Sequence, residues 1–144
     1  MAKYSTQGLL LQIGETTDAS SALSTIGNLN SFSPPIGDDS SEIDVTDYTS
    51  TVKEFILGLK DGGSMDVSGF WDSEIPEHAE LISANNTQTL KQFLVTFTDG
   101  TTTPSTLGFN AFVKNLNSST EIDDAFQFTA TLRVSGTKTY TPAT

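Results

Sequence analysis

The chain has 144 residues, which is enough for one domain with a buried core but too few for two. It contains no cysteine, which excludes disulfides, thiolate metal sites and a cysteine nucleophile and fits a cytosolic product. The formal net charge of −11 argues against a partner held through its phosphates, because nucleic-acid affinity depends on clustered Lys and Arg.

The beginning of the chain predicts neither a secretion signal nor a membrane span. Residues 1–6 lack the apolar stretch of a signal peptide, and the longest early apolar run is three leucines. The apolar run of residues 8–14, closed by glycine, predicts a first strand, and the Ser, Thr, Ala and Asp stretch after it predicts a loop. Residues 26–33 form a second candidate strand, which must end at Pro34 because proline has no N–H to donate to a ladder.

Two further strands are predicted at residues 41–46 and 64–71, because apolar and polar side chains alternate in both. The apolar side chains are Ile43, Val45, Met65, Val67 and Trp71, and the acids on the polar face are Glu42, Asp44 and Asp66. A strand cannot turn these acids inward without exposing its apolar side chains.

Between these strands, residues 47–63 are predicted to form a long loop that is unusually apolar. Its large side chains are Tyr48, Val52, Phe55, Ile56, Leu57 and Leu59, and it closes with two glycines. Connecting loops are usually short and polar, so this one has to be buried against something. It could fold back as a short satellite strand over its own sheet. The alternative, a cover supplied by another subunit, is favoured because a monomer seldom leaves such a patch exposed.

One helix is predicted after the second of these strands. Pro76 suits its first turn, acidic side chains complement the helix dipole there, and residues 85–86 should end it. The stripe expected to face the core contains Ile75, Ala79 and Ile82, with Leu81 beside it. His78, the only histidine, is predicted to be a surface residue.

The rest of the chain predicts three more strands, at residues 90–98, 107–113 and 125–135. Their inward side chains would be Phe93, Val95, Phe97, Leu107, Phe109, Ala111, Val113, Phe126, Phe128, Ala130, Leu132 and Val134. Residues 137–144 are expected to form a loosely held tail. The predicted fold is mainly β: two packed antiparallel sheets, as a sandwich or partly closed barrel, with one flanking α-helix and the long apolar loop.

Signals for catalysis or metal binding are weak. The acids between residues 38 and 47 suggest a calcium loop, but they lack the D-x-D-x-D-G spacing and the closing glutamate, and strand alternation would scatter them. A carboxylate pair such as Asp66 with Glu42 can be proposed for any acidic chain. One histidine makes no metal cluster, no G-x-S-x-G is present, and residues 62–63 lack the phosphate-loop pattern. We therefore expect no enzyme activity, metal or cofactor.

Three segments together resemble the tail tube (major tail) proteins of long-tailed, non-contractile bacteriophages. They read EIDVTD…VKEFILGLKDGGS, DSEIPEHAEL and DDAFQFTATLRVSGT, and they occur in the right order over most of the chain. The resemblance implies one tail-tube domain over residues 1–144. Within it, residues 1–8 would be an N-terminal arm, residues 47–63 an inter-subunit loop and residues 137–144 a C-terminal tail.

In that family, subunits form rings, commonly of six, whose sheets join into an inner barrel, and rings stack into a hollow tube for DNA passage. The resemblance implies that the loop side chains Tyr48 to Leu59 contact neighbouring subunits. If the acidic faces line the channel, Glu42, Asp44 and Asp66 would form a negative wall that repels DNA phosphates.

The resemblance also implies partners and a location. The chain would bind copies of itself and the tail initiator or baseplate, tape measure and tail terminator proteins, with DNA passing without specific binding and no membrane contact. It would be made in the cytoplasm of the bacterial host and end in the virion tail. A rival hypothesis is a carbohydrate- or receptor-binding β-sandwich that uses Trp71 or Tyr48 as an aromatic platform. A third hypothesis is an enzyme that acts through its carboxylates.

Overall fold

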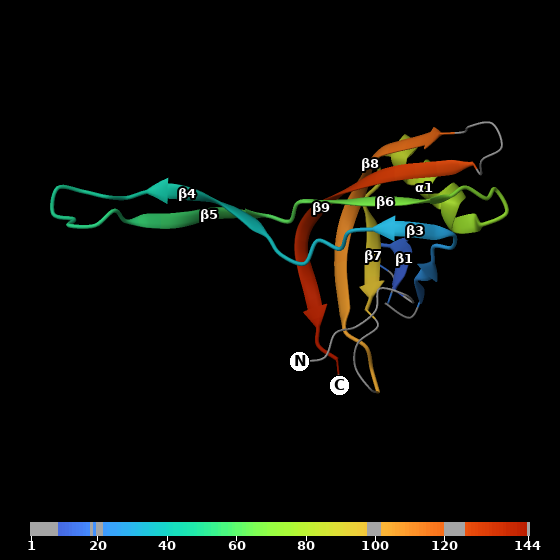
Figure 1. Ribbon diagram of the computed structural model, residues 1–144, viewed down its shortest axis with the longest axis horizontal. Coiled ribbons are helices and arrows are strands. Elements are labelled where there is room, and N and C mark those ends of the chain that lie inside the picture. Colours follow the sequence, from blue (N-terminus) through green and yellow to red (C-terminus); the bar gives the residue numbers. More distant parts are fainter. Residues whose placement is uncertain (1–8, 18, 20–21, 98–101, 120–125, 144) are drawn as a thin grey trace.

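The computed structural model describes residues 9–17, 19, 22–97, 102–119 and 126–143. In this part of the chain the main element is a seven-stranded antiparallel sheet with the strand order β2-β1-β7-β8-β9-β6-β3 (Figure 1). Its strands are β1 (Leu10–Glu15), β2 (Ser24–Thr25), β3 (Leu29–Phe32), β6 (Ser64–Phe70), β7 (Lys91–Thr96), β8 (Thr106–Ser119) and β9 (Gln127–Thr141). A separate two-stranded sheet contains β4 (Asp39–Asp44) and β5 (Phe55–Asp61). The predicted mainly-β class, with antiparallel sheets and one flanking helix, is confirmed.

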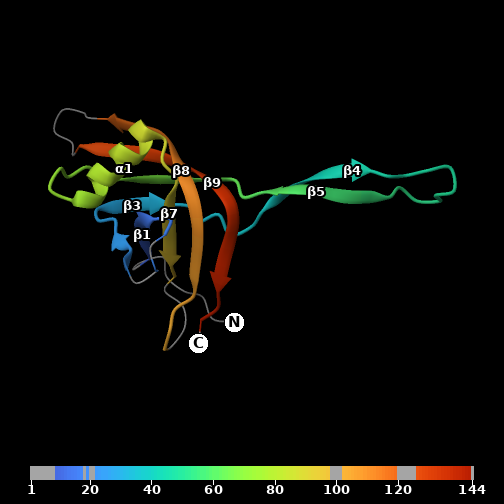
Figure 2. The ribbon, with the colours of Figure 1, turned by 180° about the vertical axis from the view of Figure 1, so that it is seen from behind.

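The large sheet curls because its two longest strands bend. The register of β8 against β9 shifts between Gly108 and Asn110 and again between Val113 and Asn115, and such irregularities bend and twist a strand. In Figures 1 and 2, β6 and β3 consequently run across the direction of β7 and β1. The curled sheet wraps its own apolar face into a core.

The core follows the alternation that the sequence predicts. Its most deeply buried members come from β1, β6, β7, β8, β9 and the helix: Leu11, Ile13, Met65, Phe93, Val95, Ala111, Phe128, Leu132, Leu81 and Ala84. Phe126 was expected to point inward and is 44% exposed instead, because it precedes the first paired residue of β9. Trp71 and Phe97 pack at the margin of the core.

The opposite face of the sheet is open and nearly uncharged. It carries amide and hydroxyl side chains such as Gln12, Gln92, Asn110, Thr129 and Thr131, and Gln92 of β7 lies directly opposite Asn110 of β8. Part of this face forms a groove of about 450 Å³ between β7, β8 and the end of β9. Two charged side chains, Asp66 of β6 and Arg133 of β9, also lie on this face.

The helix α1 (Pro76–Thr87) begins at the predicted proline but turns a different face to the core. His78, Leu81 and Ala84 are buried, whereas Ile82 of the predicted stripe is 38% exposed. The helix also continues through residues 85–86, because the Asn85 amide donates a 2.9 Å hydrogen bond to the Val113 carbonyl.

The surface prediction for His78 is wrong, since its side chain is fully buried. Nε2 lies 2.8 Å from the Gly27 carbonyl oxygen, and Nδ1 accepts a 3.1 Å hydrogen bond from the Asp72 backbone N–H. The ring also packs against Trp71 and Phe128, with centroid distances of 5.2 and 4.9 Å. Because both ring nitrogens have partners, burial costs the imidazole little, and the ring joins three segments that are distant in sequence.

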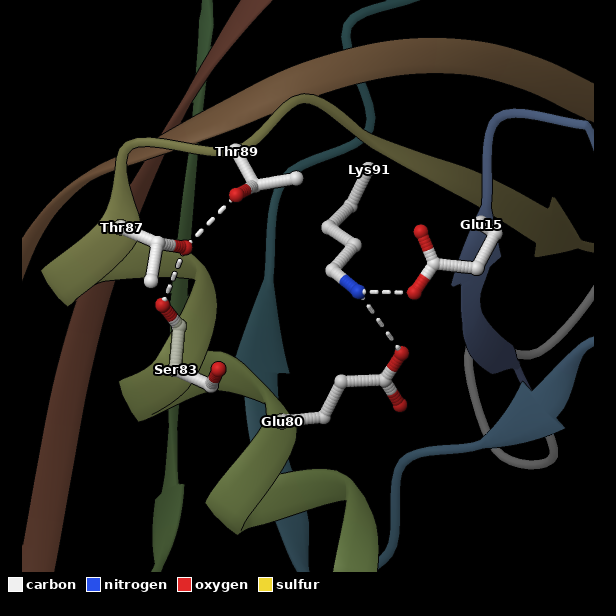
Figure 3. Close-up of polar contacts among 6 residues, drawn as sticks. All are labelled: Glu15, Glu80, Ser83, Thr87, Thr89 and Lys91. Carbon is white, nitrogen blue, oxygen red and sulfur yellow. Dashed lines mark hydrogen bonds and ion pairs between the residues drawn. The ribbon is translucent and has the colours of Figure 1, made fainter.

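A buried lysine fastens the other side of the helix to the sheet (Figure 3). Lys91 Nζ lies 2.5 Å from Glu15 of β1 and 3.4 Å from Glu80 of α1. Burial alone would lower the pKa of Lys91, but the hydrogen bond and charge of Glu15 and the charge of Glu80 outweigh it, so the pKa is raised above 10.5. Figure 3 also shows Thr87, at the end of the helix, bonded to the Ser83 carbonyl and the Thr89 hydroxyl.

The predicted loose tail is wrong for its greater part. β9 continues to Thr141, and Thr106 to Gly108 of β8 pair with Thr139 to Thr141. The predicted N-terminal arm, residues 1–8, lies outside the described residues.

His78→Ala tests whether the imidazole joins these segments. The change leaves the partly buried Gly27 carbonyl and Asp72 N–H without this partner and opens a cavity beside Trp71, so the free energy of unfolding should fall by roughly 2–4 kcal/mol. Urea denaturation measures this, with exposed Ser83→Ala on the same helix as the control, which should shift stability by less than about 0.5 kcal/mol. A His78→Ala change as small as the control would contradict the assignment.

Candidate functional site

The most distinctive surface feature is a projecting β-hairpin, residues 38–63, which we call the arm. Figures 1 and 2 show β4 and β5 extending away from the large sheet into open space. The two strands pair antiparallel, with Ile43 opposite Ile56 and Asp44 opposite Phe55. The prediction of a loop over residues 47–63 is therefore wrong for residues 55–61. The bulky side chains of this segment favour a strand, and the segment pairs with β4. The sequence analysis missed this strand because apolar and polar residues do not alternate clearly in it.

The arm is apolar on both faces. Cross-strand partners share a face, so Phe55 and Leu57 lie on one face, which we call the aromatic face, while Leu59 follows where the register against β4 shifts. Ile43, Val45 and Ile56 lie on the other, the aliphatic face. All six are exposed, from 41% for Val45 to 93% for Leu59. An isolated two-stranded hairpin is marginally stable in water, and large exposed apolar patches are typical of interaction surfaces.

Gly58 keeps the aliphatic face flat. A Cβ atom at this position would lie 2.4 Å from Ser41 Oγ and 3.7 Å from the Ile43 side chain. Glycine is therefore required where β5 passes close to Ser41 of β4.

The three candidate acids do not come together. Glu42 and Asp44 stand on the aromatic face of the arm, opposite Leu57 and Phe55. Asp66 lies on the open face of the large sheet, where its carboxylate accepts a 3.2 Å hydrogen bond from the Thr131 hydroxyl. Sequence alternation identified the exposed side of each strand but not that the strands belong to different sheets.

The end of the arm is a polar turn held by one carboxylate. Asp47 Oδ1 accepts hydrogen bonds from the Thr49 N–H at 2.9 Å, the Thr49 hydroxyl at 2.7 Å and the Ser50 hydroxyl at 3.2 Å. The Thr49 hydrogen bonds, with a smaller one from Ser50, lower the pKa of Asp47 below 3.8. Tyr48 and Val52 project from this turn with almost their whole side chains exposed.

The base of the arm is fastened to β9. The Arg133 guanidinium lies 2.8 Å from the Asp61 carboxylate, and the Gly63 N–H donates a 2.9 Å hydrogen bond to Asp61 Oδ1. The Val134 N–H then bonds to the Gly63 carbonyl at 3.0 Å. Gly62 packs so closely on Val134 that a Cβ atom would lie 2.6 Å from its Cγ1, and Gly63 has a φ of +78°, so both glycines are required where the chain leaves the arm.

The two residues that the rival hypothesis uses as an aromatic platform, Trp71 and Tyr48, lie in different parts of the molecule. Trp71 is half-buried and packs against a tilted His78 ring and edge-to-face against Phe128, which is a core role. Tyr48 is exposed, but it stands at the end of the arm on a turn.

Within the described ranges, no three His, Asp or Glu side chains come close enough to hold a metal ion. The single described helix, α1, is too short and too polar to cross a membrane.

A single domain that buries one face of its sheet and extends a doubly apolar arm is a subunit built for assembly. A family model described as "Phage tail tube, TTP, lambda-like" matches residues 2–144. The chain belongs to this family and is a structural subunit of a phage tail tube, a component of the virion tail.

Solved structures of such assemblies share its fold. One is from the virion of a native gene transfer agent particle, with a TM-score of 0.74, 13% identity, and coverage of 96% of this chain and 99% of the other. Another is from the SPP1 tail tube, with a TM-score of 0.70, 13% identity, and coverage of 93% and 76%. A third is from the sheath-tube complex of the extracellular contractile injection system PVC, with a TM-score of 0.68, 17% identity, and coverage of 93% and 88%. A search of curated proteins found no significant match.

The contact between Asp61 and Arg133 predicts a pH dependence at the base of the arm. The hydrogen bond from Arg133 and, next, that from the Gly63 N–H lower the pKa of Asp61 below 3.8. The contact therefore contributes stability that is present above pH 3.8 and is lost as the pH falls through the folded-state pKa. An NMR titration of the Asp61 carboxyl carbon should give a midpoint below 3.8, which Arg133→Gln should move upward. A wild-type midpoint at or above 3.8 would show that this contact does not persist in solution.

Proposed function

We propose that the chain forms rings that stack into a hollow tube and that the arm connects each subunit to its neighbours. A gene transfer agent tail of similar fold was solved with C6 symmetry, at a TM-score of 0.70, which supports rings of six. The observation that carries the proposal is the arm, whose two apolar faces are left exposed by the described residues of their own domain.

Coverage of both faces explains why the arm would matter for assembly. Burial of a large aliphatic or aromatic side chain contributes roughly 1.5–3 kcal/mol, and the arm offers six of them. Because each face needs its own cover, one arm would lie between two surfaces. Repetition around a ring multiplies these contacts, so subunits that bind weakly in pairs can form a stable tube.

The large sheet offers a second means of association. Its edge strands, β2 and β3, are short, and unpaired edges favour pairing with a neighbouring chain. Sheets of adjacent subunits would join in this way into the inner barrel, with the open polar face toward the channel. The amides and hydroxyls of that face would give DNA a surface without cationic clusters, which favours transit over binding.

Among the candidate acids, Asp66 is the best suited to the channel because it lies on this open face. Glu42 and Asp44 share a face of the arm with Phe55 and Leu57, which the proposal covers with a neighbour. The proposed channel is thus mostly neutral, with a repeated carboxylate that repels phosphates within about a Debye length, near 8 Å at physiological salt.

The remaining parts of the proposal concern partners and location. Similar folds occur in structures described as a baseplate, a sheath/tube terminator and a tube-terminating cap of contractile injection systems. We expect the chain to contact an initiator or baseplate protein, a tape measure and a terminator, after synthesis in the host cytoplasm. Its role is structural, without an enzymatic step.

Phe55→Asp combined with Leu59→Asp tests the arm. Both side chains are exposed in the subunit, so the variant should remain folded with a thermal midpoint within a few degrees of wild type, yet form no tubes. Negative-stain microscopy measures tubes, and circular dichroism measures folding.

Ala79→Asp with Ser83→Asp on the exposed side of α1 is the control, because it adds the same charge and should still assemble. Normal tubes from the arm variant would refute the proposal, and loss of folding would favour an arm that packs within its own subunit. A folded monomer that binds glycans would favour the receptor-binding hypothesis.

Asp66→Lys tests the channel. If Asp66 faces the channel, the substitution should leave the strands formed and make tubes retain DNA, with retention falling as salt rises. The measurement is DNA retention by reconstituted tubes, or DNA release from tailed particles, across a salt series. Glu42→Lys with Asp44→Lys is the comparison, and it should alter assembly more than retention. Retention caused only by the arm pair would place the channel acids on the arm instead, and no retention in any well-formed tube would place all three elsewhere.

A further inference from the structure

A second contact at the base of the arm is formed by a lysine that the sequence does not single out. Lys138 lies in the part of β9 beyond its pairing with β6, and its side chain is 5% exposed. Its Nζ donates to the carbonyl oxygens of Pro35 at 2.7 Å, Gly37 at 2.6 Å and Gly62 at 3.3 Å, and lies 2.9 Å from Asp38 Oδ1.

These acceptors come from the two chain segments that join the arm to the domain. Residues 35–38 lead into β4, and Gly62 follows the end of β5. One ammonium group therefore binds the entering and the leaving segment and holds both against β9. The contact between Arg133 and Asp61 involves only the leaving segment, and its two side chains are about half exposed.

The chemistry of the contact requires lysine. An ammonium group is compact and carries three donors, so it can bond in several directions to carbonyls that converge on one point. The planar fork of an arginine does not match such a set of acceptors. A side chain without charge would leave the partly buried carbonyl groups of Pro35 and Gly62 without this donor, and such groups carry a free-energy cost.

A small rotation at the base of the arm produces a large displacement at its far end. The seven residues of β5 span about 23 Å at roughly 3.3 Å per residue. A rotation of about 10° at the base would then move the far end of β5 by about 4 Å, which is comparable to a strand spacing. Apolar faces that must meet a neighbour in register cannot tolerate such a displacement.

We propose that Lys138 is a positioning residue that fixes the direction of the arm in the free subunit and so makes it competent to assemble. This rests on the proposed function for the role of the arm, but the direction of the arm can be measured without assembly. The substitution Lys138→Met removes the ammonium and keeps a side chain of similar length. Lys114→Met, at an exposed lysine of β8, is the matched control.

The direct test is a distance measurement in the monomer. The chain has no cysteine, so Thr51→Cys at the end of the arm and Ser83→Cys on α1 can carry two spin labels without background. Pulsed electron spin resonance should give a narrow distance distribution in the parent and in Lys114→Met. Lys138→Met should broaden it at least twofold. A distribution as narrow as that of the parent would overturn the proposal.

Assembly provides the second readout. With fragments of parental tubes as seeds, Lys138→Met should raise the concentration needed for growth at least tenfold, while Lys114→Met should not change it. Lys138→Arg should not restore growth, because its fork does not fit the carbonyls. A broad distance distribution with normal growth would refute the link to assembly and leave the proposed function intact. Failure of the proposed function is recognised separately, by normal tubes from the Phe55 and Leu59 double variant.

Folding is checked by thermal denaturation, where Lys138→Met should retain a cooperative transition because its contacts lie outside the core cluster. If that variant does not fold, Asp38→Asn replaces it. This change removes the charge of one acceptor and leaves Lys138 in place. It should broaden the distance distribution to a smaller extent, and a distribution identical to that of the parent would then reject the proposal.

Discussion

A two-stranded hairpin has no core of its own, and this constraint explains the division of labour in the molecule. The large sheet curls until Phe93, Met65 and Phe128 bury one another, so the domain is complete by itself. The arm cannot do this, because both of its faces carry large apolar side chains, and these are exposed in the part of the chain that the structure describes. In the proposed assembly, neighbouring subunits provide the missing layers.

Because the arm is joined to the domain only at its base, the polar contacts there carry its direction. Two cationic side chains of β9 contact aspartates at the base of the arm. Arg133 contacts Asp61 at the end of β5, and Lys138 contacts Asp38 just before β4. Electrostatics at the base and apolar contacts along the strands thus serve different ends. The first sets where the arm points, and the second determines what it binds.

The charge of the chain is distributed to match this arrangement. The net charge is −11, yet the open face of the sheet is lined mainly by amides and hydroxyls. A polar surface with few cations offers DNA phosphates little to bind.

Periodicity and composition alone determined the mainly-β class, the strands over the core and the start of the helix at Pro76, because alternation and proline act through local geometry. They also singled out Phe55, Ile56, Leu57 and Leu59 as unusually apolar for a connecting segment, which predicts contacts with another subunit. Only the tertiary structure decided that these residues form a strand of a projecting arm, since pairing with β4 is a non-local event. The same holds for His78 and Lys138, whose burial depends on carbonyl groups far away in the sequence, and no pattern of neighbouring residues records such partners.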